Sequence, residues 1–195
     1  MPRPLVILFA RAPRLGAVKR RLAAGIGDRA ALRFYTATLA ATARPIARDR
    51  RWRTVIATTP RGARADWARF VPRGTERIDQ RRGDLGARMA ACLRRAPRAV
   101  LAGSDIPDLR PADIAAAFRA FGRADAVFGP ATDGGYWLVG LGPRRPARPF
   151  ARVRWSTRHA LADTLANFRA HRVALLRRLQ DVDTAEDLAR LRGRP

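Results

Sequence analysis

Short apolar runs recur along the chain, and longer amphipathic segments separate them. Each run spans only a few residues and is bounded by turn residues, which is typical of strands buried on both faces of a sheet. The predicted strands are Leu5–Phe9, Arg53–Thr58, Ala99–Ala102 and Ala126–Phe128.

Between these runs, apolar residues recur every three or four positions, which predicts amphipathic helices. One helix opens at Lys19, and a longer one runs to about Arg48 with Asp28 as its predicted cap. Further helices are predicted over Ala65–Phe70, Leu85–Arg95 capped by Asp84, Pro111–Phe121, Arg158–Phe168 capped by Ser156 or Thr157, and Ala185–Leu191. Strands and helices that alternate in this way are typical of βαβ units, so the fold class is α/β.

The alternation breaks at Gly129–Gly140, where the sequence reads GPATDGGYWLVG. Glycines beside an aspartate permit a sharp turn or the close approach of a ligand to the backbone. Tyr136–Leu141 is therefore predicted to return as a hairpin strand. A further short run, Val173–Leu176, is predicted to form the last strand. We expect a three-layer α/β/α, Rossmann-like architecture with a mostly parallel mixed sheet.

Carboxylates stand at strand ends and in the loops that follow. Asp105 comes just after the run Ala99–Ala102, where a buried strand reaches the surface. Ligands bind beyond the carboxyl ends of the strands in open α/β sheets, so Asp105 is a candidate ligand or metal carboxylate. A turn-capping role explains Asp105 equally well.

Two more aspartates precede the last predicted helix. Thr184 and Asp187 have the spacing of a capping box, which leaves Asp181 and Asp183 available for chemistry. An α/β sheet could gather these carboxylates, Asp105 and Asp133 on one edge. Hard oxygen ligands suit Mg²⁺ or Mn²⁺, which commonly take one or two carboxylates and leave the rest to water and phosphate.

The loop after the first strand carries a second candidate function. A strand, a glycine-containing loop and a basic helix start can hold phosphates with backbone N–H groups, although neither a Walker A loop nor GxGxxG is present. Lys19 is the only lysine in a chain that otherwise uses arginine. A lone lysine favours a site that requires a compact ammonium group.

Composition limits the other possibilities. The chain has 195 residues, 47% of them hydrophobic, which suits one domain over residues 1–195. The net charge of +24 is spread over almost every segment without interleaved aromatics, so no specific nucleic-acid partner is expected. Cys92 has no partner for a disulfide, and no run approaches the roughly 20 apolar residues of a membrane span. We expect a cytoplasmic protein.

Six segments in order resemble the bacterial glycosyltransferase-like family associated with arsenosugar biosynthesis. They are FARAPRLGAVKRRL, GDLGARM, LAGSDIPDL, GPATDGGYWLVGL, RWST and DVDTAEDL, and they span nearly the whole chain. The resemblance implies the nucleotide-diphospho-sugar transferase (GT-A) fold. More distantly, the chain resembles the 2-phospho-L-lactate and molybdenum-cofactor guanylyltransferases.

The resemblance implies a role for each matching residue. Arg11, Gly16 and Lys19 would bind the phosphates of a nucleotide, and Asp105 and Asp183 would hold Mg²⁺ or Mn²⁺. The acceptor or the transferred group would lie at Asp133, Gly134, Gly135 and Tyr136, with Trp155 beside it. Lys19, Asp105 and Asp133 are the candidate catalytic residues. Arg20 replaces the threonine usual in the KTRL motif, and Ser104–Pro107 lacks an Asp-x-Asp motif.

Three functions follow. The first is a metal-dependent glycosyltransferase that takes a nucleotide-sugar and a small-molecule acceptor. The second is a nucleotidyltransferase that joins a nucleoside triphosphate to a small phosphorylated or carboxylate acceptor. The third is an arginine-rich protein that binds nucleic acid through charge.

Overall fold

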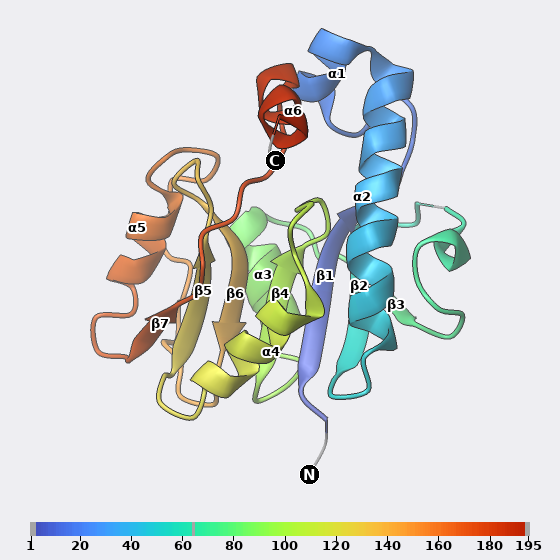
Figure 1. Cartoon of the computed structure of the whole chain (residues 1–195). Helices are drawn as coiled ribbons and strands as arrows, with labels where there is room; N and C mark the ends of the chain where they lie inside the picture. Colours follow the sequence, from blue (N-terminus) through green and yellow to red (C-terminus); the bar gives the residue numbers. More distant parts are fainter. Residues whose placement is uncertain (1–2, 64, 194–195) are drawn as a thin grey trace.

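A seven-stranded sheet forms the centre of the computed structural model, which describes residues 3–63 and 65–193 (Figure 1). The strand order is β3-β2-β1-β4-β6-β5-β7. The strands are β1 (Leu5–Arg11), β2 (Arg53–Thr59), β3 (Glu76–Asp79), β4 (Ala99–Gly103), β5 (Ala126–Pro130), β6 (Tyr136–Leu141) and β7 (Val173–Leu175).

The β6 strand runs antiparallel to both neighbours, β4 and β5, whereas the other paired strands run parallel. The predicted mixed, mostly parallel sheet is therefore confirmed. Because β6 runs in reverse, its first residue lies at the edge where β4 and β5 end. Tyr136 pairs with Pro130 at that edge.

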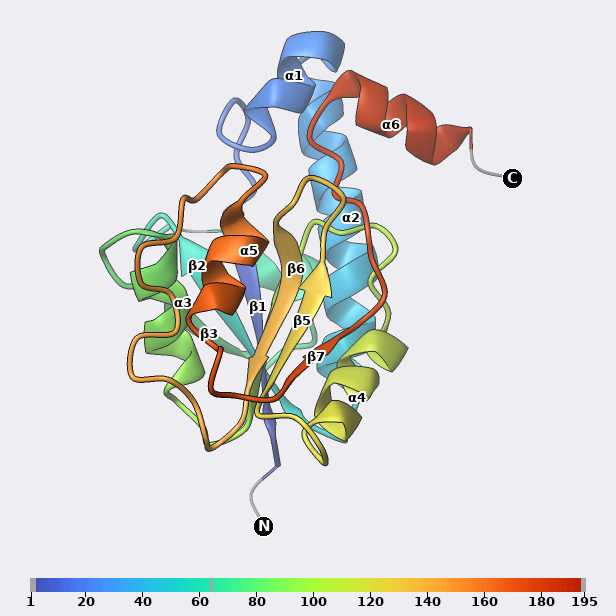
Figure 2. The same ribbon diagram turned by 90° about the vertical axis from the view of Figure 1, so that its left-hand side faces the viewer.

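Helices cover both faces of the sheet, as the predicted three layers require. Figures 1 and 2 show α2 (Asp28–Arg48) and α4 (Pro111–Ala120) on one face, with α3 (Leu85–Leu93) and α5 (Ala160–Ala166) on the other. The alternating side chains of β1 divide between the two layers. Val6 and Leu8 pack in the core that contains α2 and α4, and Leu5 and Ile7 pack in the opposite core.

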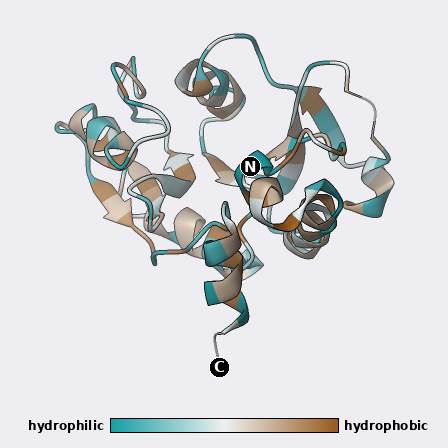
Figure 3. Ribbon diagram, turned by 90° about the horizontal axis from the view of Figure 1, so that it is seen from above, coloured by the Kyte–Doolittle hydropathy of each residue, from teal (hydrophilic) through white to brown (hydrophobic). Residues whose placement is uncertain are grey.

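The helices carry apolar residues toward these cores and polar residues outward, and Figure 3 shows both colours along them. Within residues 3–63 and 65–193, none of the helices combines the length and the apolar character that a membrane span requires.

Two short helices, α1 (Arg20–Ile26) and α6 (Ala185–Arg192), lie beyond the carboxyl end of β1 (Figures 1 and 2). They share a separate apolar cluster that includes Leu22, Val182 and Leu188. A Cβ on Gly25 would lie 2.7 Å from the Cβ of Ala185, so the two helices touch closely. Segments from opposite ends of the chain thus meet above the sheet.

Several local predictions need correction. The edge strand β3 was not predicted, because its residues Glu76–Asp79 alternate between half-buried and exposed and are mostly charged. The segment predicted as a helix over Ala65–Phe70 contains only a 3₁₀ turn at Trp67–Arg69. Such short, half-exposed segments carry little hydrophobic periodicity, so tertiary pairing decides their conformation.

Two predicted caps are wrong, and two are confirmed. Gly27 is the N-cap of α2, and Asp28 is its first residue. The α5 helix begins at Ala160 after His159, without a side-chain cap from Ser156 or Thr157. Asp84 accepts a hydrogen bond from the Ala87 N–H, and Thr184 with Asp187 forms the predicted capping box. Nearby cap-forming residue types compete, and sequence alone ranks them poorly.

Candidate functional site

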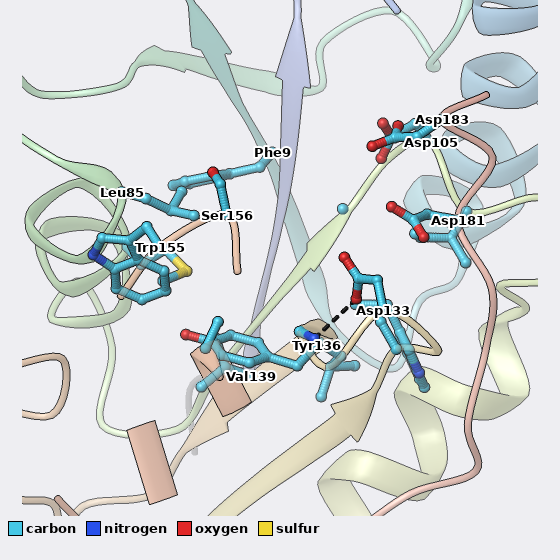
Figure 4. Close-up of a pocket in the computed structure, with 18 of the residues that line it drawn as sticks. Phe9, Leu85, Asp105, Asp133, Tyr136, Val139, Trp155, Ser156, Asp181 and Asp183 are labelled. Atoms are coloured by element: carbon cyan, nitrogen blue, oxygen red, sulfur yellow. Dashed lines mark hydrogen bonds between the residues drawn. The ribbon is translucent and has the colours of Figure 1, made fainter. Parts of the chain in front are cut away.

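The candidate carboxylates converge at one edge of the sheet. Asp105 follows β4, Asp133 lies in the β5–β6 hairpin, and Asp181 and Asp183 lie between β7 and α6. Figure 4 shows all four on the same side of one cavity. The parallel strands end at this edge and β6 begins there, so distant parts of the chain meet at one place.

Lys19 connects two of these carboxylates. Its Nζ atom lies 2.7 Å from Asp105 Oδ2 and 2.8 Å from Asp183 Oδ1. The lysine side chain is only 5% exposed, whereas the two carboxylates are 36% and 29% exposed. Burial alone would lower the pKa of Lys19, but the two carboxylate charges outweigh burial and raise that pKa above its usual value. Lys19 therefore stays charged at neutral pH.

The backbone at Lys19 is also unusual. Its φ is 47°, in the left-handed region that is costly for residues other than glycine, and it is the N-cap of α1. Arg21 on the first turn of α1 also contacts Asp183. The two ion pairs to Asp183 tie the start of α1 to the segment before α6.

The ion pairs with Lys19 and Arg21 change the pKa of Asp183. Burial would raise the pKa of Asp183, but Lys19 and Arg21 lower it below its usual value. Lys19 also lowers the pKa of Asp181, but its effect is smaller than the effects that raise it. Burial, followed by the charges of Asp183 and Asp133, raises the pKa of Asp181 to about 6. The carboxylates at this edge are thus electrostatically distinct.

The larger of two adjoining cavities has a volume of about 860 Å³. Figure 4 shows its two walls, with the carboxylates opposite a group of apolar and aromatic side chains. The apolar wall includes Phe9, Leu85, Met89, Tyr136, Val139 and Trp155. This size and lining suit an organic small molecule, with a few polar groups to orient it.

The smaller cavity, about 330 Å³ in volume, is basic on one side. Its lining includes Arg11, Lys19, Arg20 and Arg21, together with Ala17 and Val18 of the β1–α1 loop. Asp105 and Asp183 line both cavities and so mark the boundary between them. A cationic loop of this kind suits the phosphates of a nucleotide.

Tyr35 of α2 fixes the start of this loop. Its hydroxyl donates to the Arg11 carbonyl at 2.7 Å and accepts from the Arg11 N–H at 2.9 Å. In the sequence, Tyr35 lies on the apolar side of the helix predicted to run to about Arg48. No sequence pattern predicts the contact of its hydroxyl, because the partner is a backbone group 24 residues away.

Two glycines of the predicted site are placed beside the cavities rather than in their linings. Gly16 has a φ of 70° and lies in the β1–α1 loop, and Gly134 has a φ of 86° in the hairpin. A Cβ on Gly134 would lie 2.2 Å from the Arg158 carbonyl oxygen, so close packing against that segment requires glycine here. Gly135 and Tyr136 do line the larger cavity.

A family model matches residues 42–157, more than half of the chain, and carries the description "Uncharacterized protein conserved in bacteria (DUF2064)". The chain belongs to the DUF2064 family. No curated protein matches this DUF2064 chain.

Solved structures show the fold family. A protein from Desulfovibrio desulfuricans G20, described provisionally as a nucleotide-diphospho-sugar transferase, has 30% identity and a TM-score of 0.88, with 98% of this chain and 87% of that chain covered. Molybdopterin-guanine dinucleotide biosynthesis protein A from Archaeoglobus fulgidus has 15% identity and a TM-score of 0.53, covering 95% of each chain. The predicted nucleotide-diphospho-sugar transferase fold is therefore confirmed.

A third structure shares the fold at still lower identity. It is 4-diphosphocytidyl-2C-methyl-D-erythritol synthase from Anaerococcus prevotii DSM 20548, at 9% identity and a TM-score of 0.55, with 98% of this chain and 99% of that chain covered.

The site of this DUF2064 chain has the donor chemistry for a divalent cation. Among the described residues, no three His, Cys, Asp or Glu side chains form a group able to hold a metal alone. Mg²⁺ and Mn²⁺ accept one or two carboxylates with water and substrate phosphate, so Asp105 and Asp183 fit if a phosphate is also present. Lys19 already contacts both carboxylates, so a cation there would share these oxygens with the ammonium group.

We expect Asp181→Asn to stabilise this DUF2064 protein at neutral pH. Because the pKa of Asp181 is raised to about 6 in the folded protein, folding stability falls as pH rises from about 4 to about 6. Allowing for partial solvent exposure, removal of this cost is worth about 1 kcal/mol, or roughly 2–4 °C in Tm.

Thermal unfolding at about pH 7.5 and about pH 4 measures this effect, and the gain should nearly vanish at the lower pH. Asp66→Asn, at an exposed aspartate outside the cavities, is the matched control. A lower Tm for Asp181→Asn at neutral pH would contradict the assigned cost.

Proposed function

We propose that this protein is a metal-dependent glycosyltransferase that uses a nucleotide-sugar donor. One observation carries the proposal: Lys19, Asp105 and Asp183 meet at the boundary between a basic cavity and a larger, partly aromatic one. The 30% identity to the Desulfovibrio desulfuricans protein, over 98% of this chain, supports the same class of reaction.

In this proposal, the diphosphate of the donor lies in the smaller cavity. Arg11, Lys19 and Arg21 offset its negative charge, which increases at the leaving oxygen as the glycosidic bond breaks. Lys19 remains protonated throughout, because two carboxylates hold its charge. A divalent cation held by Asp105 and Asp183 would add Lewis-acid stabilisation of the departing nucleoside diphosphate.

The acceptor and the transferred group would occupy the larger cavity. Asp133 stands on its acidic wall, and its Oδ1 accepts a hydrogen bond from the Gly135 N–H at 2.8 Å. This contact orients the carboxylate, whose other oxygen can accept the proton of an acceptor hydroxyl as general base. The resemblance to the family associated with arsenosugar biosynthesis supports a sugar donor and leaves the acceptor open.

Nucleotidyl transfer is the second candidate, and the number of cations around the smaller cavity favours it. Arg11, Lys19, Arg20 and Arg21 all line that cavity, and a nucleoside triphosphate carries more charge for them to offset than a diphosphate does. The more distant resemblance to 2-phospho-L-lactate guanylyltransferase supports this reaction. The acceptor would then attack the α-phosphate and release pyrophosphate.

Thermal shift with nucleotides and nucleotide-sugars, each with and without Mg²⁺ or Mn²⁺, tests ligand binding first. At one hundred times Kd, a bound ligand adds about 2.7 kcal/mol of stability, or roughly 5–10 °C in Tm. We expect this shift only when the nucleotide and the divalent cation are both present.

Product analysis then separates the two reactions. Release of nucleoside diphosphate from a nucleotide-sugar supports glycosyl transfer, and release of pyrophosphate from a nucleoside triphosphate supports nucleotidyl transfer. If neither product forms and nucleotides cause no shift, both proposals are wrong. Binding to nucleic acid that falls steeply with salt and ignores the aspartates would favour the charge-driven alternative.

A further inference from the structure

The two walls of the larger cavity differ in chemistry. Figure 4 shows Trp155, Ser156, Phe9 and Leu85 across from Asp105, Asp181 and Asp183, with Asp133 and Tyr136 below. Both walls belong to one continuous cavity of about 860 Å³. A ligand that fills it would meet an aromatic surface and a negatively charged surface at the same time.

Trp155 is the centre of the aromatic wall. Its ring packs edge-on to Tyr136 at 6.4 Å between centroids and tilted to Phe150 at 6.2 Å. Trp155 remains only half-buried, although both neighbouring rings pack against it. Part of the indole is therefore free to stack on a ligand.

The segment that carries Trp155 is held in place on both sides. A Cβ on Gly86 of α3 would lie 2.9 Å from Trp155 Cζ2, so the indole packs directly on the helix backbone. On the other side, the Arg158 carbonyl oxygen packs against Gly134 of the hairpin. Ser156 between them has a φ of 59°, a strained conformation that surrounding contacts must maintain. Trp155 is thus a preorganised surface.

Asp133 provides the polar contact opposite Trp155. Its Oδ1 accepts a hydrogen bond from the Gly135 N–H, whereas its Oδ2 accepts none from the described residues. Asp181 lines the same cavity and adds negative charge, whereas Lys19 pairs with Asp105 and Arg21 pairs with Asp183. Arg158 is the other cation in this lining. The charge here is opposite in sign to the net charge of +24 of the whole chain. An anionic group at Asp133 would meet the like charges of Asp133 and Asp181, neither of which has an ion pair among the described residues.

We propose that the larger cavity selects a neutral or cationic polyhydroxy acceptor, whose apolar face stacks on Trp155 and whose hydroxyl or ammonium group binds Asp133. The cavity excludes the phosphorylated or carboxylate equivalent. That this ligand is the acceptor rests on the proposed glycosyl transfer. Nucleotidyl transfer to a phosphorylated or carboxylate acceptor would require the opposite selectivity, in favour of an anionic ligand.

Three phenyl glycosides with one scaffold test the selection. Phenyl glucoside is neutral, phenyl glucosaminide carries an ammonium group, and phenyl glucuronide carries a carboxylate. Calorimetric titration of the full-length protein at neutral pH should give at least about tenfold tighter binding of the first two than of the glucuronide. The proposal is overturned if the glucuronide binds as tightly, or if none of the three binds.

Variants locate the interaction. Trp155→Leu keeps an apolar side chain but removes the stacking face, and should weaken binding of phenyl glucoside about fivefold or more. Asp133→Asn should weaken the binding of phenyl glucosaminide and reduce the difference in affinity between the other glycosides and phenyl glucuronide. Trp67→Phe changes a buried tryptophan outside the cavity and should leave all three affinities unchanged. If Trp155→Leu binds phenyl glucoside as tightly as Trp67→Phe does, Trp155 is not part of the binding site.

Titration with nucleoside diphosphate and Mg²⁺ on the same samples separates this inference from the proposed function. Nucleotide binding without discrimination among the phenyl glycosides would overturn the acceptor class alone. Discrimination without nucleotide binding or donor cleavage would overturn glycosyl transfer and leave the cavity specificity standing. A thermal unfolding curve for each variant excludes loss of the fold as the cause.

Discussion

Asp105→Asn is expected to lower turnover and divalent-dependent nucleotide binding by about 100-fold or more, because even partners that only orient metal ligands often contribute 10–100-fold. The substitution keeps the shape of the side chain and removes the charge that a cation and Lys19 share. The fold should persist, since Asp105 is 36% exposed in a loop and Lys19 keeps its contact with Asp183.

Calorimetric titration of the nucleotide with and without Mg²⁺ measures this effect. Glu186→Gln is a matched control, because Glu186 is 83% exposed on α6 and lines neither cavity. The control should bind nucleotide normally. Unchanged affinity in Asp105→Asn would defeat the assignment of Asp105 as a metal ligand.

Lys19→Met is expected to destabilise the protein and to abolish nucleotide binding. The substitution leaves Asp105 and Asp183 close together without the ammonium group that separates them. Fully buried pairs lose 3–5 kcal/mol in such a change, but these carboxylates are about one third exposed, so about 2 kcal/mol is expected. This corresponds to a Tm lower by roughly 4–8 °C.

A divalent cation provides the decisive comparison for this variant. Mg²⁺ or Mn²⁺ should restore part of the lost Tm in Lys19→Met, because the cation can occupy the oxygens that the ammonium group leaves. Lys19→Arg should retain more stability but weaken turnover, since a planar guanidinium cannot replace a compact ammonium group between two carboxylates. Full activity in Lys19→Arg would make the lone lysine a coincidence of composition.

The hydrophobic pattern was sufficient to predict the centre of the fold. The predicted runs Leu5–Phe9 and Ala99–Ala102 lie in the adjacent strands β1 and β4. Asp105 follows the second run closely, so its place at a strand end could be predicted from the sequence. The hairpin at Asp133–Tyr136 was also predicted, because glycine and aspartate turn chemistry is local. Motif order was sufficient to indicate the fold family, which the structural matches confirm.

Other features depend on contacts between distant residues. Lys19 and Asp183 are 164 residues apart, and no local pattern relates them. The hydrogen bonds of the Tyr35 hydroxyl also join residues that are distant in the sequence. An apolar helix position does not indicate that its side chain bonds to the Arg11 backbone. The edge strand β3 follows from pairing with β2 and has too few apolar residues to be recognised alone.

The sequence by itself determined the α/β class, the central strands and the candidate carboxylates, because burial on two faces and turn chemistry act over a few neighbouring residues. Only the tertiary structure decided that Lys19 bridges Asp105 and Asp183, and that an aromatic wall faces an acidic one in the larger cavity. These arrangements arise when α1, α6 and the hairpin pack over one edge of the sheet. Packing of that kind depends on the shapes of segments far apart in the chain, which periodicity does not encode.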